Sequence, residues 1–178
     1  LNTMVKDVDY DLSNYRVTEA AKALEEFVDE LSNWYVRRSR SRFWAKGMEQ
    51  DKINAYMTLY TALVTTAKAA APMIPFMTES IYRNLVCSID EKAPESVHLC
   101  DFPKANEAHI DKELEKNMGE VLEIVVLGRA ARNEANIKNR QPIGKMFVKA
   151  PVVLPDFYKE IVEEELNVKE VVFTDDME

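Results

Sequence analysis

The strongest constraint on the fold is a helical period that returns in three long stretches of the chain. Apolar side chains recur at three- and four-residue steps over residues 18–35, 51–71 and 107–134, which places them on one face of an α-helix. Only four glycines occur among the 178 residues, and the helix-forming residues Ala, Leu, Glu, Lys and Met are abundant. We therefore predict a mainly α protein organised as an antiparallel helix bundle.

Each predicted helix has an inward face and recognisable ends. Thr18 is placed to cap the first helix, and Pro72 and Pro75 predict a sharp corner after the second because proline cannot continue a helix. The inward residues of the first helix are expected to be Leu24, Phe27, Val28, Leu31, Trp34 and Tyr35. Those of the second helix are expected to be Ile53, Tyr56, Met57, Tyr60, Leu63, Val64 and Ala67. A short helix after the corner is predicted to turn inward Met77, Ile81 and Leu85.

The character of the sequence changes after Pro142. The predicted elements there are, in order, a strand over 145–153, a helix over 156–166 capped by Asp156, and a strand over 168–173. This β-α-β unit is too small for a doubly wound enzyme core, and it has no glycine-rich phosphate loop. We expect a helical domain at 1–142 and a small α/β subdomain at 143–178.

Charge is distributed unevenly along the chain. The formal net charge is −8, which at first argues against nucleic acid because polyanion binders carry a basic surface. Residues 150–178, however, hold nine acidic and two basic side chains. Residues 31–48 hold five basic side chains and no acidic one, and residues 128–149 hold six with Glu134 as the only acid. These two basic segments are the candidate phosphate-facing surfaces.

The first basic segment interleaves aromatic and arginine side chains in the string NWYVRRSRSRFW at 33–44. Guanidinium groups pair with phosphate and stack on bases, and aromatic rings offer faces to unpaired bases. The alternative is that the aromatic rings form core and that the arginines cover its rim with their aliphatic stems. Trp34, on the inward stripe, is predicted to be core. The predicted RNA-binding residues of this segment are Arg37, Arg38, Arg40, Arg42, Trp44 and Lys46.

The second basic segment ends in IKNRQP at 137–142. Lys138 and Arg140 could meet phosphate, and Gln141 could hydrogen-bond the edge of an unpaired base. In the alternative interpretation these polar groups form a structural junction that caps the long helix at its C-terminal end, where cations are favoured. The sequence supports the two interpretations equally.

No catalytic or metal site is predicted. Cys87, His98 and Cys100 lack the paired spacing of a zinc site and a clear fourth ligand, and two cysteines make no disulfide framework. No apolar run approaches the roughly 20 residues of a membrane span, and the polar N-terminal stretch has no signal-peptide core. We expect a cytoplasmic protein whose cysteines stay as thiols.

Four separated blocks carry a family resemblance. The first is the arginine string at 33–44, and the others are APMIPFMTESIYRNL at 71–85, ESVHLCDFP at 95–103 and GRAARNEANIKNRQPIGKM at 128–146. Together they resemble the anticodon-binding helical domain of isoleucyl-tRNA synthetases, in the form shared by the eukaryotic-like bacterial branch. The last three resemble the family patterns APxxPFxxExIYxNL, SVHLxDFP and GRxxRxxxxIKxRQPL. Ile143 replaces the leucine of the last pattern, which is a conservative departure.

The resemblance implies that the chain is a piece of a class I synthetase that recognises tRNA-Ile by its anticodon arm. The whole enzyme of that family joins isoleucine to tRNA-Ile through an aminoacyl-adenylate, using ATP and magnesium. Both ATP-binding signatures of the class are missing from this sequence, and KMFVK at 145–149, superficially similar to one of them, is interpreted as structural. The fragment is therefore expected to be non-catalytic, cofactor-free and monomeric. Its expected partners are tRNA-Ile and the catalytic and C-terminal domains of the same enzyme.

Two alternatives stay open. The equivalent helical domain of a valyl-, leucyl- or methionyl-tRNA synthetase is built alike, although NWYVRRSR and IKNRQP favour the isoleucine enzyme. A helical protein-interaction scaffold could also use the basic segments to bind an acidic partner. Such a scaffold would show no preference for tRNA over another polyanion.

Overall fold

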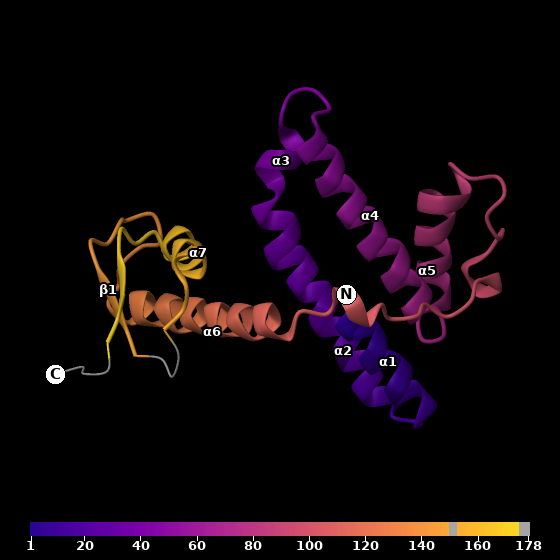
Figure 1. Cartoon of the computed structure of the whole chain (residues 1–178), viewed down its shortest axis with the longest axis horizontal. Coiled ribbons are helices and arrows are strands. Elements are labelled where there is room, and N and C mark those ends of the chain that lie inside the picture. The colour runs from indigo at the N-terminus through magenta and orange to yellow at the C-terminus, as the bar shows by residue number, and fades with distance from the viewer. Residues whose placement is uncertain (150–152, 175–178) are drawn as a thin grey trace. The chain divides into compact units, whose positions relative to one another are not determined.

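The structure is mainly helical, as the sequence predicts, with a small parallel sheet near the C-terminus (Figure 1). This computed structural model describes residues 1–149 and 153–174. The chain divides into two compact units, Leu1–Ile110 and Asp111–Glu178. The long helix predicted over 107–134 begins later, at Lys112, and lies in the second unit, whereas Glu107–His109 form a 3-10 segment of the first. The domain boundary after residue 142 stays a prediction. Within the described ranges, no helix combines the length and apolarity that crossing a membrane requires.

The N-terminal unit is a set of helices joined by short turns and one long connection. Its α-helices are α1 (Asn2–Ser13), α2 (Val17–Glu30), α3 (Arg40–Trp44), α4 (Gln50–Ala70) and α5 (Pro75–Tyr82). Its π and 3-10 segments are η1 (Leu31–Val36), η2 (Arg83–Cys87), η3 (Val97–Leu99) and η4 (Glu107–His109). The predicted capping by Thr18 is wrong, because Thr18 lies inside α2, which begins at Val17 with Arg16 at the N-cap position. The amide of Arg16 donates to the carbonyl of Asp11 at 2.8 Å, and this tight turn after α1 sets the start of the helix.

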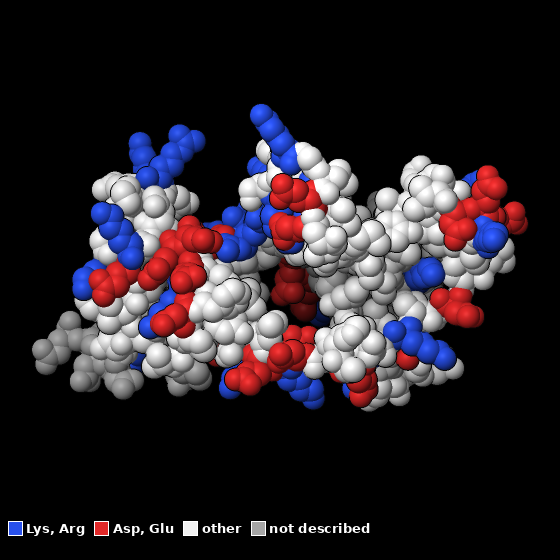
Figure 2. Space-filling view, turned by 45° about the horizontal axis from the view of Figure 1, so that its top comes forward, with Lys and Arg blue, Asp and Glu red and all other residues white. Residues whose placement is uncertain are grey.

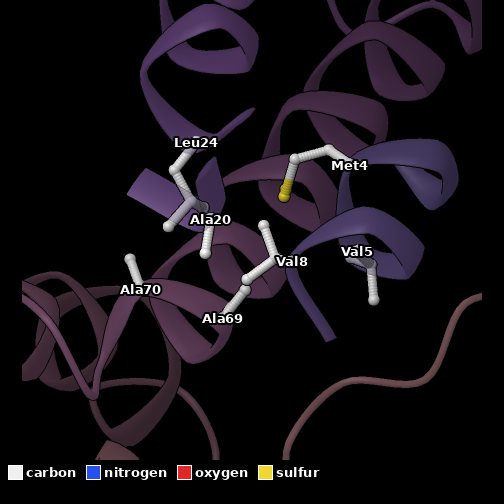
Figure 3. Packing of buried hydrophobic residues seen from close by; sticks show 7 residues of the cluster. All are labelled: Met4, Val5, Val8, Ala20, Leu24, Ala69 and Ala70. Atoms are coloured by element: carbon white, nitrogen blue, oxygen red, sulfur yellow. The ribbon is translucent and has the colours of Figure 1, made fainter. Parts of the chain in front are cut away.

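The core of this unit forms where α1, α2 and the end of α4 meet. Figure 3 shows the converging side chains, which are Met4, Val5, Val8, Ala20, Leu24, Ala69 and Ala70. The buried face of α4 consists of Ala55, Ala62, Ala67, Ala69 and Ala70. Small side chains let neighbouring helices approach closely, so larger residues lie at the margin. Tyr56 and Met57, predicted to face inward, are 44% and 56% exposed.

The α-helical period breaks where α2 continues into the π-helix η1. The wider π turn rotates the following side chains away from a 3.6-residue repeat. Within η1, Trp34 is only partly buried. In α2, before this turn, Leu24 is buried but Val28 of the predicted stripe is already 49% exposed. The predicted place of Trp34 in the core is therefore wrong.

The predicted proline corner is present, and α5 begins at Pro75. The buried residues of α5 are Thr78 and Tyr82, whereas Met77, predicted to face inward, is 63% exposed. The Thr78 hydroxyl donates to the carbonyl of Ile74 at 2.9 Å, so this polar side chain is satisfied within its own helix. Hydrogen bonding thus lets Thr78 occupy the inward position.

The long connection after α5 is tied to that helix by Glu79. Its carboxylate accepts hydrogen bonds from the Ser96 hydroxyl at 2.8 Å and the Val97 amide at 2.9 Å, and these bonds lower the pKa of Glu79. Tyr82 packs beside this contact, and burial raises the pKa of its hydroxyl. Tyr82 forms a second apolar cluster with Ala71 and Val97. The partly buried free thiols packed against this cluster are Cys87 and Cys100.

The C-terminal unit packs a β-α-β motif against a long helix. Its elements are α6 (Lys112–Glu134), β1 (Met146–Val148), α7 (Asp156–Leu166) and β2 (Val171–Phe173). The two strands pair in parallel, with Met146 opposite Val171, so the β-α-β prediction is confirmed. The first strand is shorter than predicted, and residues 150–152 of that prediction lie outside the described ranges.

Two details set the geometry of this unit. Gly128 of α6 lies against α7, and a Cβ added there would be 2.3 Å from Leu166 Cδ1, so glycine permits the close approach. Asp111 caps α6 by accepting hydrogen bonds from two backbone amides. The predicted cap by Asp156 is wrong, because α7 begins at that residue with Pro155 at the N-cap position.

Candidate nucleic-acid interface

The first basic segment lies where η1 passes into α3. Arg37 lies over the Trp34 ring, with Cζ 5.7 Å from the ring centre, and Arg40 lies over Trp44 at 5.4 Å. The face of an indole ring attracts a cation, so each tryptophan orients one guanidinium. The Arg37 Nε also donates to the carbonyl of Asn33 at 2.7 Å. Both arginines are exposed, and the segment therefore presents oriented positive charge to solvent.

Adjacent aromatic residues in this segment have opposite environments. Phe43 is 9% exposed, and its ring centre lies 6.4 Å from Tyr35 and 5.0 Å from Tyr56 of α4. Trp44 is 76% exposed. Phe43 therefore anchors α3, whereas Trp44 offers an aromatic surface to solvent. The two interpretations of the interleaved string apply to different residues.

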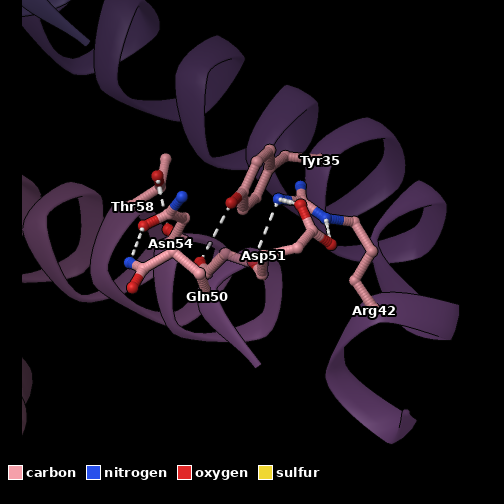
Figure 4. A network of polar contacts seen from close by, with 7 residues as sticks. Tyr35, Arg42, Gln50, Asp51, Asn54 and Thr58 are labelled. Atoms are coloured by element: carbon pink, nitrogen blue, oxygen red, sulfur yellow. Dashed lines mark hydrogen bonds and ion pairs between the residues drawn. The ribbon is translucent and has the colours of Figure 1, made fainter. Parts of the chain in front are cut away.

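Arg42 differs from the other arginines because its guanidinium is bound to α4. Its Nε and Nη2 donate to the two carboxylate oxygens of Asp51 at 2.8 and 2.7 Å. This hydrogen bonding lowers the pKa of the Asp51 carboxyl. Figure 4 shows Tyr35 beside the pair, where its hydroxyl donates to the carbonyl of Ala55 at 3.0 Å. The charge of Arg42 is thus compensated directly by Asp51.

The remaining predicted residues of the segment lie on its exposed side. Figure 2 shows lysine and arginine side chains projecting from the part of the N-terminal unit that contains α3. Arg38 and Lys46 are both exposed. The predicted residues of this segment that are exposed are thus Arg37, Arg38, Arg40, Trp44 and Lys46.

The second basic segment forms a turn after α6. Asn136 adopts a left-handed conformation with φ 53°, which ends the helix, and the Ile137 amide returns to the carbonyl of Arg132 at 2.8 Å. A left-handed residue followed by such a backbone bond is a common way to close a helix. The predicted residues of the turn, Lys138, Arg140 and Gln141, are all exposed.

The turn is held from within by Arg132, a residue that the sequence analysis missed. Arg132 is 4% exposed, and its Nη2 donates to the carbonyl of Lys138 at 2.7 Å and to that of Gln141. The helix end is therefore closed by backbone groups and a buried arginine. A signal was present in the spacing, because the buried stripe of α6 runs through Val121, Val125, Gly128 and Arg132. A cation on an apolar stripe indicates a buried polar partner.

These surfaces are suited to binding an anionic, partly unpaired polymer. They expose guanidinium groups, amines, an amide and an indole ring, which together contact phosphates and base faces. Across the described parts of the chain, no group of three or more His, Cys, Asp or Glu side chains could hold a metal ion.

Comparison with known proteins agrees with a nucleic-acid interface. Residues 1–148 match the family described as "Anticodon-binding domain of tRNA ligase". The chain is similar to isoleucine–tRNA ligase of Clostridium tetani, with 54% identity over 177 residues, and to that of Clostridium novyi, with 56% identity over 177 residues. It is 47% identical over 176 residues to isoleucine–tRNA ligase of Dehalococcoides mccartyi strain CBDB1.

These matches cover nearly the whole of this chain but a small part of each relative. They include 99%, 99% and 97% of the chain, respectively. The chain spans 17% of the length of each of these three relatives.

Proposed function

The chain belongs to the family of anticodon-binding domains of tRNA ligases, and we propose that it binds the anticodon arm of tRNA-Ile as part of an isoleucyl-tRNA synthetase. Similarity to isoleucine–tRNA ligases along nearly all of the chain supports isoleucine over valine, leucine or methionine. The observation that carries an RNA-binding role is the exposed Arg40–Trp44 pair within a segment that has no acidic residue.

Each exposed group has a proposed role. Trp44 stacks on an unpaired base, with Arg40 behind the ring supplying positive charge. The groups proposed to neutralise phosphates near α3 are those of Arg37, Arg38, Arg40 and Lys46. In the C-terminal unit, Lys138 and Arg140 contact phosphate, and Gln141 hydrogen-bonds a base edge. Arg42 contributes little, because Asp51 already compensates its charge.

The chemistry of the whole synthetase belongs to the longer protein. We propose that isoleucine, ATP and magnesium bind outside this chain, in a catalytic domain of the same cytoplasmic enzyme, which joins isoleucine to tRNA-Ile. This chain contributes affinity and placement of the tRNA. Isoleucine-dependent pyrophosphate exchange by the isolated chain would contradict this division.

Titration of the purified chain with tRNA-Ile, total tRNA and heparin tests the proposal. We expect a preference for tRNA-Ile, and a log affinity that falls with log salt by about 0.7 for each phosphate contact in single-stranded regions. Roughly three to five contacts would give a slope of about −2 to −3.5. Equal binding of tRNA and heparin would instead indicate a basic scaffold.

A matched pair of charge reversals locates the site. Arg38→Glu should weaken tRNA-Ile binding, because it reverses an exposed charge in the basic segment. Lys22→Glu, an equal charge change on the exposed face of α2, should have a much smaller effect. Equal losses from both variants would indicate only a general response to net charge.

A further inference from the structure

We infer that Arg132 is a positioning residue for RNA binding, which holds the 138–141 turn in the shape that presents Lys138 and Arg140. The inference rests on the proposed function, since that assigns RNA contact to this turn. Arg132 itself is 4% exposed and does not reach the surface, whereas Lys138 and Arg140 are exposed. Its action therefore passes through the backbone of the turn.

Arg132 closes the turn by bridging its two ends. Its Nη2 donates to the carbonyls of Lys138 and Gln141, which are the first and last residues of the turn. The Gln141 amide donates to the same Lys138 carbonyl at 2.9 Å. The turn is thus closed by a backbone bond and by a guanidinium that bridges its two ends. A functional loop keeps its geometry when neighbouring side chains hydrogen-bond to its backbone in this way.

A second side chain holds the middle of the turn. Asn167, in a left-handed conformation after α7, donates from Nδ2 to the Asn139 carbonyl at 3.2 Å. Its own carbonyl accepts from the Ile143 amide at 3.1 Å. Three carbonyls of the turn are therefore occupied by side chains from two helices, and its basic side chains remain on the solvent side.

The charge of Arg132 is buried and only partly satisfied by hydrogen bonds. Its Nε and Nη1 are buried and have no hydrogen-bond partner in the described part of the chain. The neighbouring Arg129, in contrast, pairs with Glu165 at 2.9 Å. A buried cation without a carboxylate partner is costly, and an apolar residue of similar volume is often better tolerated. Its charge is held at the Lys138 and Gln141 carbonyls and adds to the attraction of the turn for phosphate.

A double-mutant cycle tests the inference. Arg140→Ala should weaken tRNA-Ile binding by about tenfold, the loss of one charge-assisted hydrogen bond. Arg132→Met should weaken it to a similar extent, and it should also reduce the salt slope by about 0.7, although Arg132 touches no phosphate. The double variant should bind better than the product of the two losses predicts, because both changes remove the same contact.

Two further variants keep the test decisive. Asn167→Gly removes the hydrogen bond to the Asn139 carbonyl but suits the left-handed backbone, and it should also weaken tRNA-Ile binding. It replaces Arg132→Met in the test if that variant does not fold. Lys116→Met removes an exposed charge of α6 that lies outside the basic segment, and it should leave the affinity close to that of the wild type. All titrations are run well below the melting temperature of each variant.

The outcomes separate this inference from the proposed function. If Arg140→Ala weakens binding while Arg132→Met and Asn167→Gly do not, the turn contacts RNA without support, and the inference is overturned. An additive loss with an unchanged salt slope would also overturn it, because that result indicates only structural damage. If neither Lys138→Ala nor Arg140→Ala changes the affinity for tRNA-Ile, the turn does not contact RNA and the inference is overturned. The proposed function is then still tested by Trp44→Ala in the first basic segment.

Discussion

In the first basic segment an arginine near the surface, Arg42, is held by a carboxylate, whereas in the second a buried arginine, Arg132, is held by carbonyl groups. The Asp51 carboxylate neutralises Arg42 and lowers its value as a phosphate ligand. The carbonyls of Lys138 and Gln141 fix Arg132 without cancelling its charge. The comparison teaches that the bonding partner of a basic residue, as well as its exposure, decides what it can offer to RNA.

The same contrast between anchoring and presenting appears in two adjacent aromatic residues. Phe43 packs between Tyr35 and Tyr56, while Trp44 is exposed and carries Arg40 over its ring. Anchoring and presenting roles thus alternate along one short helix. Variants at Phe43 and Trp44 test this difference between an anchoring and an exposed ring and measure its size.

The largest expected effect is on folding stability at Phe43. Phe43→Ala should lower the free energy of unfolding by about 3 to 5 kcal/mol, because it leaves a cavity between α3 and α4. Trp44→Ala, one residue along, should cost about 1 kcal/mol or less, since the ring is largely exposed. Urea denaturation of both variants measures the difference. Equal losses would show that Trp44 is also an anchor.

The next effect is on RNA affinity at Trp44. Base stacking on an aromatic ring is worth about 1 to 3 kcal/mol, so Trp44→Ala should weaken tRNA-Ile binding roughly 5- to 150-fold. Trp44→Phe keeps an aromatic face and should retain much of the affinity. Fluorescence anisotropy with a labelled anticodon stem-loop measures both variants. Unchanged affinity in Trp44→Ala would remove the ring from the proposed site.

The sequence predicts the helices far better than it predicts their buried faces. The α4 helix and the β-α-β order follow from periodicity, because apolar spacing records secondary structure directly. The burial of Ala55 and Ala62 in place of Tyr56 and Met57 could not be read from hydrophobicity, since it depends on how closely the helices approach. The π turn that displaces Trp34 has no comparable signal in a simple helical repeat.

The basic segments were recognisable from composition, but the partners of their side chains were not. The spacing of α6 indicates that Arg132 is buried, but only the folded chain pairs Arg42 with Asp51 and Arg132 with backbone carbonyls. Such partners depend on tertiary contacts between elements, which local periodicity does not record.

The smallest expected effect is a change in the salt dependence of RNA binding on substitution of Asp51. It tests directly whether the carboxylate partner of Arg42 makes it differ from Arg132. This carboxyl is ionised at neutral pH, as an ordinary aspartate is, and its hydrogen bonds with Arg42 lower its pKa further. Asp51→Asn removes that charge and leaves Arg42 able to neutralise a phosphate, so the slope of log affinity against log salt should steepen by about 0.7. The double variant Asp51→Asn/Arg42→Met should return to the wild-type slope, and Arg42→Met alone should leave it unchanged. If Arg42→Met alone flattens the slope by about 0.7, one full phosphate contact, then Arg42 binds RNA despite its carboxylate partner, and the two segments do not differ in the way we describe.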